Sequence, residues 1–414
     1  MNDKIVEELI KKETRRQNET INLIPSENFV SRDVLEALGS VFTNKYAEGY
    51  SAMRYYGGNE FVDQLENLAK ERSLKAFGLS SDEWGVNVQP YSGSPANLAI
   101  YVALVSLGET IMGLQLDMGG HLTHGHKVSF TSKAWKSVSY TLNKETELLD
   151  YDAIRELVKE HKPKIIVAGY TAYPRIVDFK KFREICDEVG AYLMVDMSHF
   201  AGLIAGGVYP TPFKYADVVM ATAHKTLRGP RAGVIFANRK SQIANRAGVD
   251  IVKAIDKAIF PGLQGGPHAN QIAAIAVAME EAVQLDFKEY ASQIVLNAQT
   301  LAEELKNYGF RIVAGGTDTH LLLVDLTNHG IGGKEASDKL EKNGIIVNKN
   351  TIPYDSRSPM DPSGIRMGTP ALTTRGMKEA EMKEVARMIK EVLVDGKEVL
   401  QKAKELCLKF PLNY

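Results

Sequence analysis

The sequence predicts an α/β fold, with a large domain built on a mainly parallel sheet and a smaller C-terminal α/β domain. Short apolar runs alternate with helix-like stretches in the middle of the chain, at residues 165–168, 192–195 and 218–220. A dense group of glycines and prolines at 260–268 then precedes a long helical run at 269–285. The expected segments are an N-terminal arm over 1–58, the large domain over 59–268 and the small domain over 269–414.

The composition is that of an ordinary globular protein, and it argues against several kinds of partner. The formal net charge is -1, so neither nucleic acid nor an anionic membrane is expected as a partner. The two cysteines, Cys186 and Cys407, form no disulfide framework. Cys186 lies in a helix-like run, where we expect a packing residue. The N-terminus lacks an apolar signal core and no apolar run is long enough to span a bilayer, so we expect a cytoplasmic protein.

The N-terminal region begins with two expected helices and continues into a loop rich in tyrosine. Residues 3–20 are charged and amphipathic, and residues 34–38 should form a short helix capped by Ser31 or Asp33. Residues 43–58 hold four tyrosines, one glutamate, one arginine and three glycines without a regular period. Such a loop is typical of a functional site, but a packing loop or a subunit contact could have the same composition.

A turn of small residues precedes the first apolar helix of the expected large domain. After an expected strand at 84–90, the turn Ser92-Gly93-Ser94 leads into an expected helix at 98–106. Exposed N–H groups at the start of a helix can hold a phosphate. An ordinary N-cap has the same composition, so this turn is weak evidence when taken alone.

The strongest indication of chemistry is a lysine that follows an apolar strand. The run that begins at Val218 leads to Lys225, and the preceding apolar run ends in Asp196 and His199. Because the carboxyl ends of parallel strands meet at one edge of a sheet, these groups should share a site. A lysine that binds pyridoxal phosphate works with an acid on the pyridine nitrogen. Asp196 suits that role and His199 could contact the ring hydroxyl, whereas the alternative for all three is a solvated surface position.

Three histidines follow an expected strand at 110–114. His121, His124 and His126 are spaced by three and two residues, which raises zinc as an alternative. No cysteine lies nearby and the close acid, Asp117, has no supporting ligand pattern, so no metal site is expected. We expect His121 to lie flat on a cofactor ring, and the other two histidines to form hydrogen bonds within the loop.

The C-terminal region has the pattern of a smaller α/β unit. Helices are expected at 291–307 and 334–342, strands at 320–325 and 345–347, a long loop at 348–364, and one or two charged helices at 378–406. Arg366 follows, flanked by apolar and small residues. Its guanidinium could clamp a carboxylate through two hydrogen bonds, or it could be a structural arginine that satisfies backbone carbonyls.

Nine motifs, in order along the chain, carry a resemblance to a known family. They are Leu-Ile-Pro-Ser-Glu-Asn at 23–28, Asn-Lys-Tyr-Ala-Glu-Gly-Tyr at 44–50, Arg-Tyr-Tyr-Gly-Gly at 54–58, Asn-Val-Gln-Pro-Tyr-Ser-Gly-Ser-Pro-Ala-Asn at 87–97, Gly-Gly-His-Leu-Thr-His-Gly at 119–125, Val-Asp-Met-Ser-His at 195–199, His-Lys-Thr-Leu-Arg-Gly-Pro-Arg at 224–231, Gln-Gly-Gly-Pro at 264–267 and Gly-Ile-Arg-Met-Gly-Thr-Pro-Ala at 364–371. On these motifs the chain resembles serine hydroxymethyltransferase from about residue 22 to residue 374. The resemblance implies the PLP-dependent transferase (aspartate aminotransferase-like) fold.

The resemblance also implies roles for individual residues in binding the cofactor, pyridoxal 5'-phosphate. Lys225 would form the Schiff base, Asp196 would hold the pyridine nitrogen, His199 would lie by the ring hydroxyl and His121 would stack on the ring. The other cofactor contacts would come from Ser92, Gly93, Ser94, Thr171, Tyr46 and Gly266. Of these, Tyr46 and Gly266 would come from the partner subunit. Thr171 stands where the family usually has serine.

Further residues would bind substrates or take part in catalysis. Arg366, helped by Ser26, would hold the amino-acid carboxylate. The catalytic set would be Lys225, Glu48, His224, Tyr56 and Thr222. The substrate and folate side would be lined by Tyr55, Tyr56, Leu116, Leu122, Asn350, Glu48 and His199. Glu48, from the partner subunit, would take part in proton transfer at the serine hydroxyl and contact the pterin.

The implied reaction transfers the hydroxymethyl unit of L-serine to tetrahydrofolate through an external aldimine and a quinonoid. Its products are glycine and 5,10-methylenetetrahydrofolate, and it is reversible. The family builds its site across a subunit interface, so a homodimer or a dimer of dimers is implied, without membrane or nucleic-acid partners. The rival interpretations are a threonine aldolase or an aminotransferase of the same fold, and a non-catalytic scaffold or RNA-binding paralogue.

The chain departs from the usual family pattern at several positions. Ser51-Ala52-Met53 replaces Pro-Gly-Lys/Gln, and Ala221 and Ala223 replace threonines. Ser198 replaces alanine, and Leu-Asp-Met at 116–118 differs from the bacterial Leu-Ala-His. None of these changes removes a named catalytic group, so they bear on folate affinity and loop rigidity.

Overall fold

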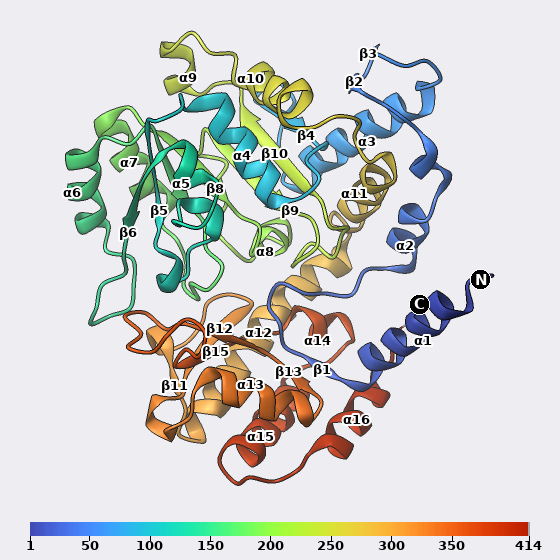
Figure 1. Ribbon diagram of the computed structural model, residues 1–414, viewed down its shortest axis with the longest axis vertical. Helices are drawn as coiled ribbons and strands as arrows, with labels where there is room; N and C mark the ends of the chain where they lie inside the picture. The colour runs from blue at the N-terminus through green and yellow to red at the C-terminus, as the bar shows by residue number, and fades with distance from the viewer. Residues whose placement is uncertain (413–414) are drawn as a thin grey trace. The chain divides into compact units, whose positions relative to one another are not determined.

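The computed structural model describes residues 1–412, and the chain divides into two compact units (Figure 1). The larger unit is Val30–Ala291, and the smaller unit combines Met1–Phe29 with the chain from Ser292 onward. These units differ from the segments expected at 1–58, 59–268 and 269–414. Within the larger unit, helix α11 (Ala269–Glu281) packs on α3 (Glu60–Ala76) and α2 (Arg32–Leu38), which explains why residues 269–291 belong with it.

The central sheet of the larger unit is mainly parallel, as expected. In the described chain its seven strands follow the order β4-β10-β9-β8-β7-β5-β6. Their bounds are β4 (Trp84–Asn87), β5 (Thr110–Leu114), β6 (Lys136–Tyr140), β7 (Ile165–Ala168), β8 (Tyr192–Asp196), β9 (Val218–Thr222) and β10 (Gly233–Asn238). Only β10 runs against the others, because it pairs in antiparallel fashion with both β9 and β4. Strands β6 and β10 were not anticipated from the sequence.

Helices and a small hairpin complete the larger unit (Figure 1). The remaining elements are the hairpin strands β2 (Gly49–Tyr50) and β3 (Met53–Arg54) and the helices α4 (Gly93–Leu104), α5 (Thr131–Ala134), α6 (Tyr151–His161), α7 (Phe179–Val189), α8 (Ala201–Ala205), α9 (Gln242–Arg246) and α10 (Ile251–Lys257). The core joins α4, α10 and the central strands through buried side chains such as Ile100, Met194 and Ile235. Cys186 is buried on α7, as expected of a packing residue.

The smaller unit is also α/β, but its sheet is antiparallel. Among the described residues the sheet order is β11-β12-β15-β14. Its strands are β11 (Arg311–Ile312), β12 (Leu321–Asp325), β14 (Asn348–Asn350) and β15 (Gly364–Gly368), and its helices are α1 (Lys4–Glu19), α13 (Gly333–Lys342), α14 (Pro370–Thr374), α15 (Glu379–Leu393) and α16 (Leu400–Lys409). Helix α12 (Leu285–Asn307) begins in the larger unit and ends in the smaller one. Strand β1 (Ile21–Asn22) pairs with β13 (Ile345–Ile346), which joins the N-terminal segment to this unit.

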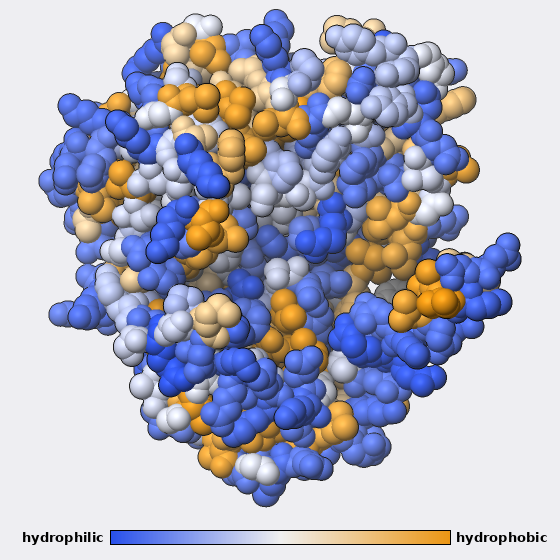
Figure 2. Space-filling view, in the orientation of Figure 1, coloured by the Kyte–Doolittle hydropathy of each residue, from blue (hydrophilic) through white to orange (hydrophobic). Residues whose placement is uncertain are grey.

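Helix α1 confirms the charged helix expected over residues 3–20. Asp3 caps it by accepting hydrogen bonds from the backbone N–H groups of Ile5 and Val6. None of its residues is buried, and the apolar side chains of Ile5, Leu9 and Ile10 are exposed. Figure 2 shows an orange, apolar patch in the region of this helix, which is otherwise hydrophilic. Within residues 1–412, no helix is long and apolar enough to cross a membrane.

Candidate active site

The candidate residues of the larger unit lie where strands of the central sheet end. Asp196 is the last residue of β8 and Thr222 is the last residue of β9, three positions before Lys225. Ser92 follows β4, the loop with His121 follows β5, and Thr171 follows β7. Because all these strands point the same way, their carboxyl ends gather these side chains at one edge of the sheet. The sequence-based expectation of a shared edge is therefore confirmed for the strands themselves.

Asp196 is buried and held by several donors at once. Its Oδ2 accepts hydrogen bonds from Asn97 Nδ2 (2.9 Å) and His124 Nε2 (3.1 Å), and its Oδ1 accepts one from the backbone N–H of Ser198 (3.1 Å). Burial alone would raise the pKa of this carboxyl group. The His124 hydrogen bond and the nearby charge of Lys225 outweigh burial and hold the pKa below its usual range. Asp196 is therefore ionised at neutral pH.

Contacts of the residues that follow Lys225 fix its loop. Thr226 Oγ1 donates to the carbonyl of His199 (3.0 Å) and accepts from the N–H of Gly202 (2.9 Å), so the loops after β9 and β8 are tied together. The Arg228 guanidinium lies 4.1 Å from the centre of the Tyr290 ring, a cation–π contact. His224, next to Lys225, has its pKa lowered to about 3 by burial and by the charges of Lys225 and Arg231. His224 is thus neutral at physiological pH.

The turn at Ser92 packs closely on the end of strand β9. Helix α4 begins at Gly93, five residues earlier than expected, so Ser92 is its N-cap and the turn residues provide its first N–H groups. The Ser92 side chain makes no capping hydrogen bond. A Cβ at Gly93 would stand 2.6 Å from Cγ2 of Thr222. Only glycine therefore fits between this turn and β9, and a helix start of this kind can receive a phosphate.

His121 and Thr171 lie in loops that contact each other. Thr171 Oγ1 donates to the carbonyl of Gly120 (2.8 Å), the residue before His121. His121 Nδ1 lies 2.7 Å from Thr123 Oγ1 and accepts the Thr123 N–H (3.2 Å). In the same region Leu116 is half-buried and Leu122 is exposed.

The tyrosine-rich loop forms a second group of predicted residues in the larger unit. Tyr46 donates its hydroxyl hydrogen to Glu48 Oε1 (3.2 Å), and the rings of Tyr46 and Tyr56 meet edge to face at 4.9 Å. A Cβ at Gly266 would lie 3.4 Å from the Tyr46 ring, and one at Gly265 would lie 3.2 Å from Glu48 Oε1. Tyr55 and Tyr56 are exposed, and Tyr55 also contacts the ring of Phe260. The printed sequence separates Tyr46 and Gly266 widely, but the fold brings them together.

Three predicted substrate residues belong to the smaller unit. Arg366 lies on β15 directly opposite Asn348, and its Nε donates to Asn348 Oδ1 (3.1 Å). Asn350 lies two residues along β14 and so shares that face of the sheet. Ser26 follows Pro25, which packs on Gly368, two residues beyond Arg366 on β15. Burial lowers the pKa of Arg366 to about 10, so its guanidinium stays charged at neutral pH.

Sequence reasoning missed one residue that contacts the candidate site, Asn97, and undervalued another, His124. Asn97, on α4, and His124 both donate hydrogen bonds to Asp196, and Asn97 also donates to Thr123 Oγ1. His124 was expected only to form hydrogen bonds within its loop. A usable signal for Asn97 was its position one helical turn after Gly93, which places both on one face of α4.

The residues at this edge fit a bound polar cofactor. Among the described side chains, several buried polar atoms without a protein partner gather here: Thr222 Oγ1, His224 Nδ1, His124 Nδ1 and Asn97 Oδ1. Buried polar atoms are normally satisfied, so such a group indicates a ligand that completes the site. An ionised Asp196 and the adjacent Lys225 match the two ends of a pyridoxal ring, its ring nitrogen and its aldehyde.

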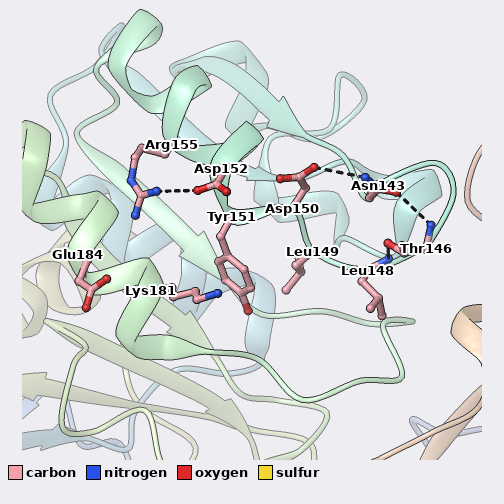
Figure 3. A pocket seen from close by; sticks show the side chains of 10 residues that line it. All are labelled: Asn143, Thr146, Leu148, Leu149, Asp150, Tyr151, Asp152, Arg155, Lys181 and Glu184. Carbon is pink, nitrogen blue, oxygen red and sulfur yellow. Dashed lines mark hydrogen bonds and ion pairs between the residues drawn. The ribbon is translucent and has the colours of Figure 1, made fainter.

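Two other features of the described chain offer no competing site. No group of three or more His, Cys, Asp or Glu side chains in residues 1–412 is arranged to hold a metal ion. A polar cavity of about 390 Å³ lies at the start of α6 (Figure 3). Its charged side chains already have partners: Arg155 pairs with Asp152 (2.8 Å), Asp150 caps α6, and Lys181 lies over the Tyr151 ring.

The fold and the site together define a pyridoxal-phosphate-dependent transferase of the aspartate aminotransferase-like fold. A comparison with protein families narrows this class. The model of the family described as serine hydroxymethyltransferase matches residues 1–389 of the 414 in the chain. The chain therefore belongs to the serine hydroxymethyltransferase family. It is a pyridoxal-phosphate enzyme of one-carbon metabolism that acts in hydroxymethyl transfer between serine and glycine, with tetrahydrofolate as cosubstrate.

Proposed function

We propose that the protein transfers the hydroxymethyl group of L-serine to tetrahydrofolate, giving glycine and 5,10-methylenetetrahydrofolate in a reversible reaction. The observation that carries this proposal is that Asp196 and Lys225 lie at or just after the carboxyl ends of two adjacent parallel strands, β8 and β9. When bound, pyridoxal phosphate supplies an electron sink for the bonds at the amino-acid Cα. The residues of this chain bind the reactants, orient them and move their protons.

The proposed cofactor contacts follow from the charges and donors at the sheet edge. Lys225 would hold the cofactor covalently, and the ionised Asp196 would keep its pyridine nitrogen protonated. The N–H groups of the turn at 92–94 hold the phosphate at the start of α4. The remaining proposed contacts come from His121, Thr171 and His199, with Tyr46 and Gly266 from a partner subunit.

We propose that His224 and Thr222 assist proton movements beside Lys225. A neutral His224 can accept or donate a hydrogen bond without placing a second cation next to the lysine. The Thr222 hydroxyl is buried at the end of β9, and the backbone N–H of Thr222 donates to Ser198 Oγ (3.1 Å). Ser198, where the family usually has alanine, thus supports the end of this strand.

The proposed substrate contacts follow the roles that the resemblance implies. Arg366 binds the amino-acid carboxylate, because a planar guanidinium can donate two parallel hydrogen bonds. Ser26 assists it, and Asn350 is proposed for the folate side. Tyr55, Tyr56, Leu116 and Leu122 are the other proposed lining residues. By fixing the carboxylate, Arg366 would orient the other substituents of Cα, and the cofactor would supply the electron sink for the bond that breaks.

We propose that Glu48 acts in the site of a partner subunit, in a homodimer or a dimer of dimers. The support is the cluster of Tyr46, Glu48 and Gly266 on one chain, together with the exposure of Tyr46. A complementation test separates shared sites from separate ones. Lys225→Arg and Glu48→Gln variants, each inactive alone, should regain about a quarter of wild-type activity after subunit exchange, because one site in each mixed dimer is intact. No recovery would show that both residues serve the site of their own chain.

The proposed activity is tested first by absorbance. The purified protein should show a visible band from lysine-bound cofactor, and Lys225→Arg should lose it. A new band at longer wavelength should grow when glycine and tetrahydrofolate are added together. A cofactor band without a response to folate would point instead to an aldolase of the same fold. No band after addition of pyridoxal phosphate would refute the proposal.

The cytoplasm, and the lack of a nucleic-acid or membrane partner, are proposed on composition alone.

A further inference from the structure

A chain of hydrogen bonds joins Asp196 to His121 through two residues without an assigned role. Asn97 Nδ2 donates to Asp196 Oδ2 (2.9 Å) and to Thr123 Oγ1 (2.9 Å). Thr123 Oγ1 in turn lies 2.7 Å from His121 Nδ1. Asn97 is fully buried, and Thr123 and Asp196 are nearly so, at 7% and 6% exposure. Bulk water therefore has little access to any of the linking hydrogen bonds.

One placement of the hydrogens satisfies every contact in this chain of hydrogen bonds. The backbone N–H of Thr123 donates to His121 Nδ1 (3.2 Å), so this nitrogen is an acceptor and carries no proton. The Thr123 hydroxyl accepts from Asn97 and donates its own hydrogen to the same nitrogen. The Asn97 amide cannot be reversed, because its oxygen would then face the ionised Asp196. This placement leaves Nδ1 of His121 as an acceptor and puts the ring proton on Nε2.

We propose that Asn97 and Thr123 are positioning residues that keep His121 in its neutral Nε2–H form while they help to hold Asp196 in place. This inference rests on the proposed function, in which His121 faces the cofactor ring and Asp196 supports the protonated ring nitrogen. A protonated His121 would be a second cation competing for the same carboxylate. A neutral imidazole leaves the whole charge of Asp196 to the ring nitrogen.

Other charged and titratable groups near His121 make this control necessary. The His124 ring lies 5.5 Å from the His121 ring, centre to centre, and donates to Asp196. The positive charge of Lys225 helps to lower the pKa of Asp196. Tyr101, from α4, donates its hydroxyl hydrogen to the carbonyl of Thr123 (3.0 Å), which fixes that residue from the other side. An ionised Asp196 would favour protonation of a nearby imidazole unless another contact opposed it.

The test uses Thr123→Val, which removes the hydroxyl but keeps the shape and the backbone N–H, and Thr123→Ser, which restores the hydroxyl. Thr131→Val is the matched control, because Thr131 is equally buried in the same unit and its hydroxyl donates to Ser129 instead. Histidine rings labelled with ¹⁵N report tautomer and protonation by NMR, and His121→Gln identifies the His121 signals. The first measurement is made on protein freed of cofactor, so it does not depend on the proposed activity.

In the wild type, His121 should stay neutral, with its proton on Nε2, at a pH where an ordinary histidine is already protonated. In Thr123→Val it should protonate near pH 6.5, whereas Thr123→Ser and Thr131→Val should behave as wild type. In the loaded enzyme, Thr123→Val should lose about tenfold in cofactor affinity at pH 6 and little at pH 8.5.

Several results would overturn the inference. They are a proton on Nδ1 of His121 in the wild type, titration of wild-type His121 near pH 6.5, or a Thr123→Val variant that matches wild type at every pH. If the protein binds no pyridoxal phosphate but His121 shows the expected tautomer, then the proposed function fails and the hydrogen-bond assignment stands. If the cofactor binds but His121 carries its proton on Nδ1, then the proposed function stands and the hydrogen-bond assignment fails.

Discussion

Gly93 gives the sharpest prediction about the proposed phosphate turn. Replacing Gly93 with alanine would place a Cβ 2.6 Å from Cγ2 of Thr222. Carbon atoms in ordinary contact lie about 3.5–4.0 Å apart, so the turn or the end of β9 must move by about 1 Å. Both segments lie at the edge of the sheet that carries Lys225, three residues after Thr222. The displacement should therefore reach the candidate site directly.

Forcing an extra carbon into a packed site costs about 1–3 kcal/mol. We expect Gly93→Ala to lower the affinity for pyridoxal phosphate roughly tenfold or more, since 1.4 kcal/mol is about tenfold in a binding constant. The assay is titration of cofactor-free protein with pyridoxal phosphate, followed by absorbance, together with urea unfolding to measure any loss of stability.

A second substitution tests whether the steric contact is the cause. Thr222→Ser removes Cγ2 and keeps the hydroxyl, so Gly93→Ala with Thr222→Ser should recover most of the lost affinity. Gly39→Ala is the control, because a Cβ there meets nothing closer than 3.6 Å and its φ is -84°. Equal affinity losses in the single and the double variant would refute the reasoning, as would a Gly93→Ala protein that binds the cofactor like wild type.

Three further predictions concern other parts of the chain. Because His224 has its pKa lowered to about 3, the unfolded state binds more protons between about pH 3 and 6.5 and stability falls as pH falls. In cofactor-free protein, the free energy of unfolding should fall by up to ~2 kcal/mol less in His224→Asn than in wild type between pH 6.5 and 4.5. Urea unfolding measures this difference, and parallel pH profiles of the two proteins would contradict the prediction. Arg375 donates to five carbonyls, including those of Asn18 and Cys407, so Arg375→Met should cost about 3–5 kcal/mol of stability, while the exposed Arg387→Met should cost under about 0.5. Ala52 has a φ of 62°, so Ala52→Gly should stabilise the protein by about 1 kcal/mol, and a lower melting temperature would argue against strain there.

The parts of the site that could be predicted from sequence are those that lie at the ends of strands. Apolar runs that stop at Asp196 and shortly before Lys225 are a local pattern, and the rule for parallel sheets converts that pattern into a common edge. The helical burial of Cys186 and the cap at Ser31 were predictable for the same reason, since each depends on a few neighbouring residues. Local patterns thus identified both the main strands of the fold and the main candidate groups.

The parts that were missed depend on contacts between distant segments. Its spacing from Gly93 places Asn97 on one face of α4, but it does not show that Asn97 meets Asp196, 99 residues later, because that contact depends on where α4 lies relative to the end of β8. Strand β10 was missed because its place depends on pairing with β4 and β9 in the antiparallel sense. The pairing of β1 with β13, which joins residues 1–29 to the smaller unit, is likewise invisible in a linear pattern.

Glycine shows most clearly how the sequence limits what can be inferred about this site. A Cβ at Gly169 would lie 2.2 Å from the carbonyl oxygen of Asp196, and one at Gly233 would lie 2.9 Å from that of Ser92. Each glycine therefore allows two backbone segments to approach at the edge where Asp196 and the turn at 92–94 lie. The sequence shows that glycine stands at these positions, but only the fold shows which backbone it meets. The chemistry at this edge thus depends as much on side chains that are absent as on Lys225 and Asp196, so alanine at Gly169, whose Cβ would lie 2.8 Å from Cβ of Asp196, should displace that residue.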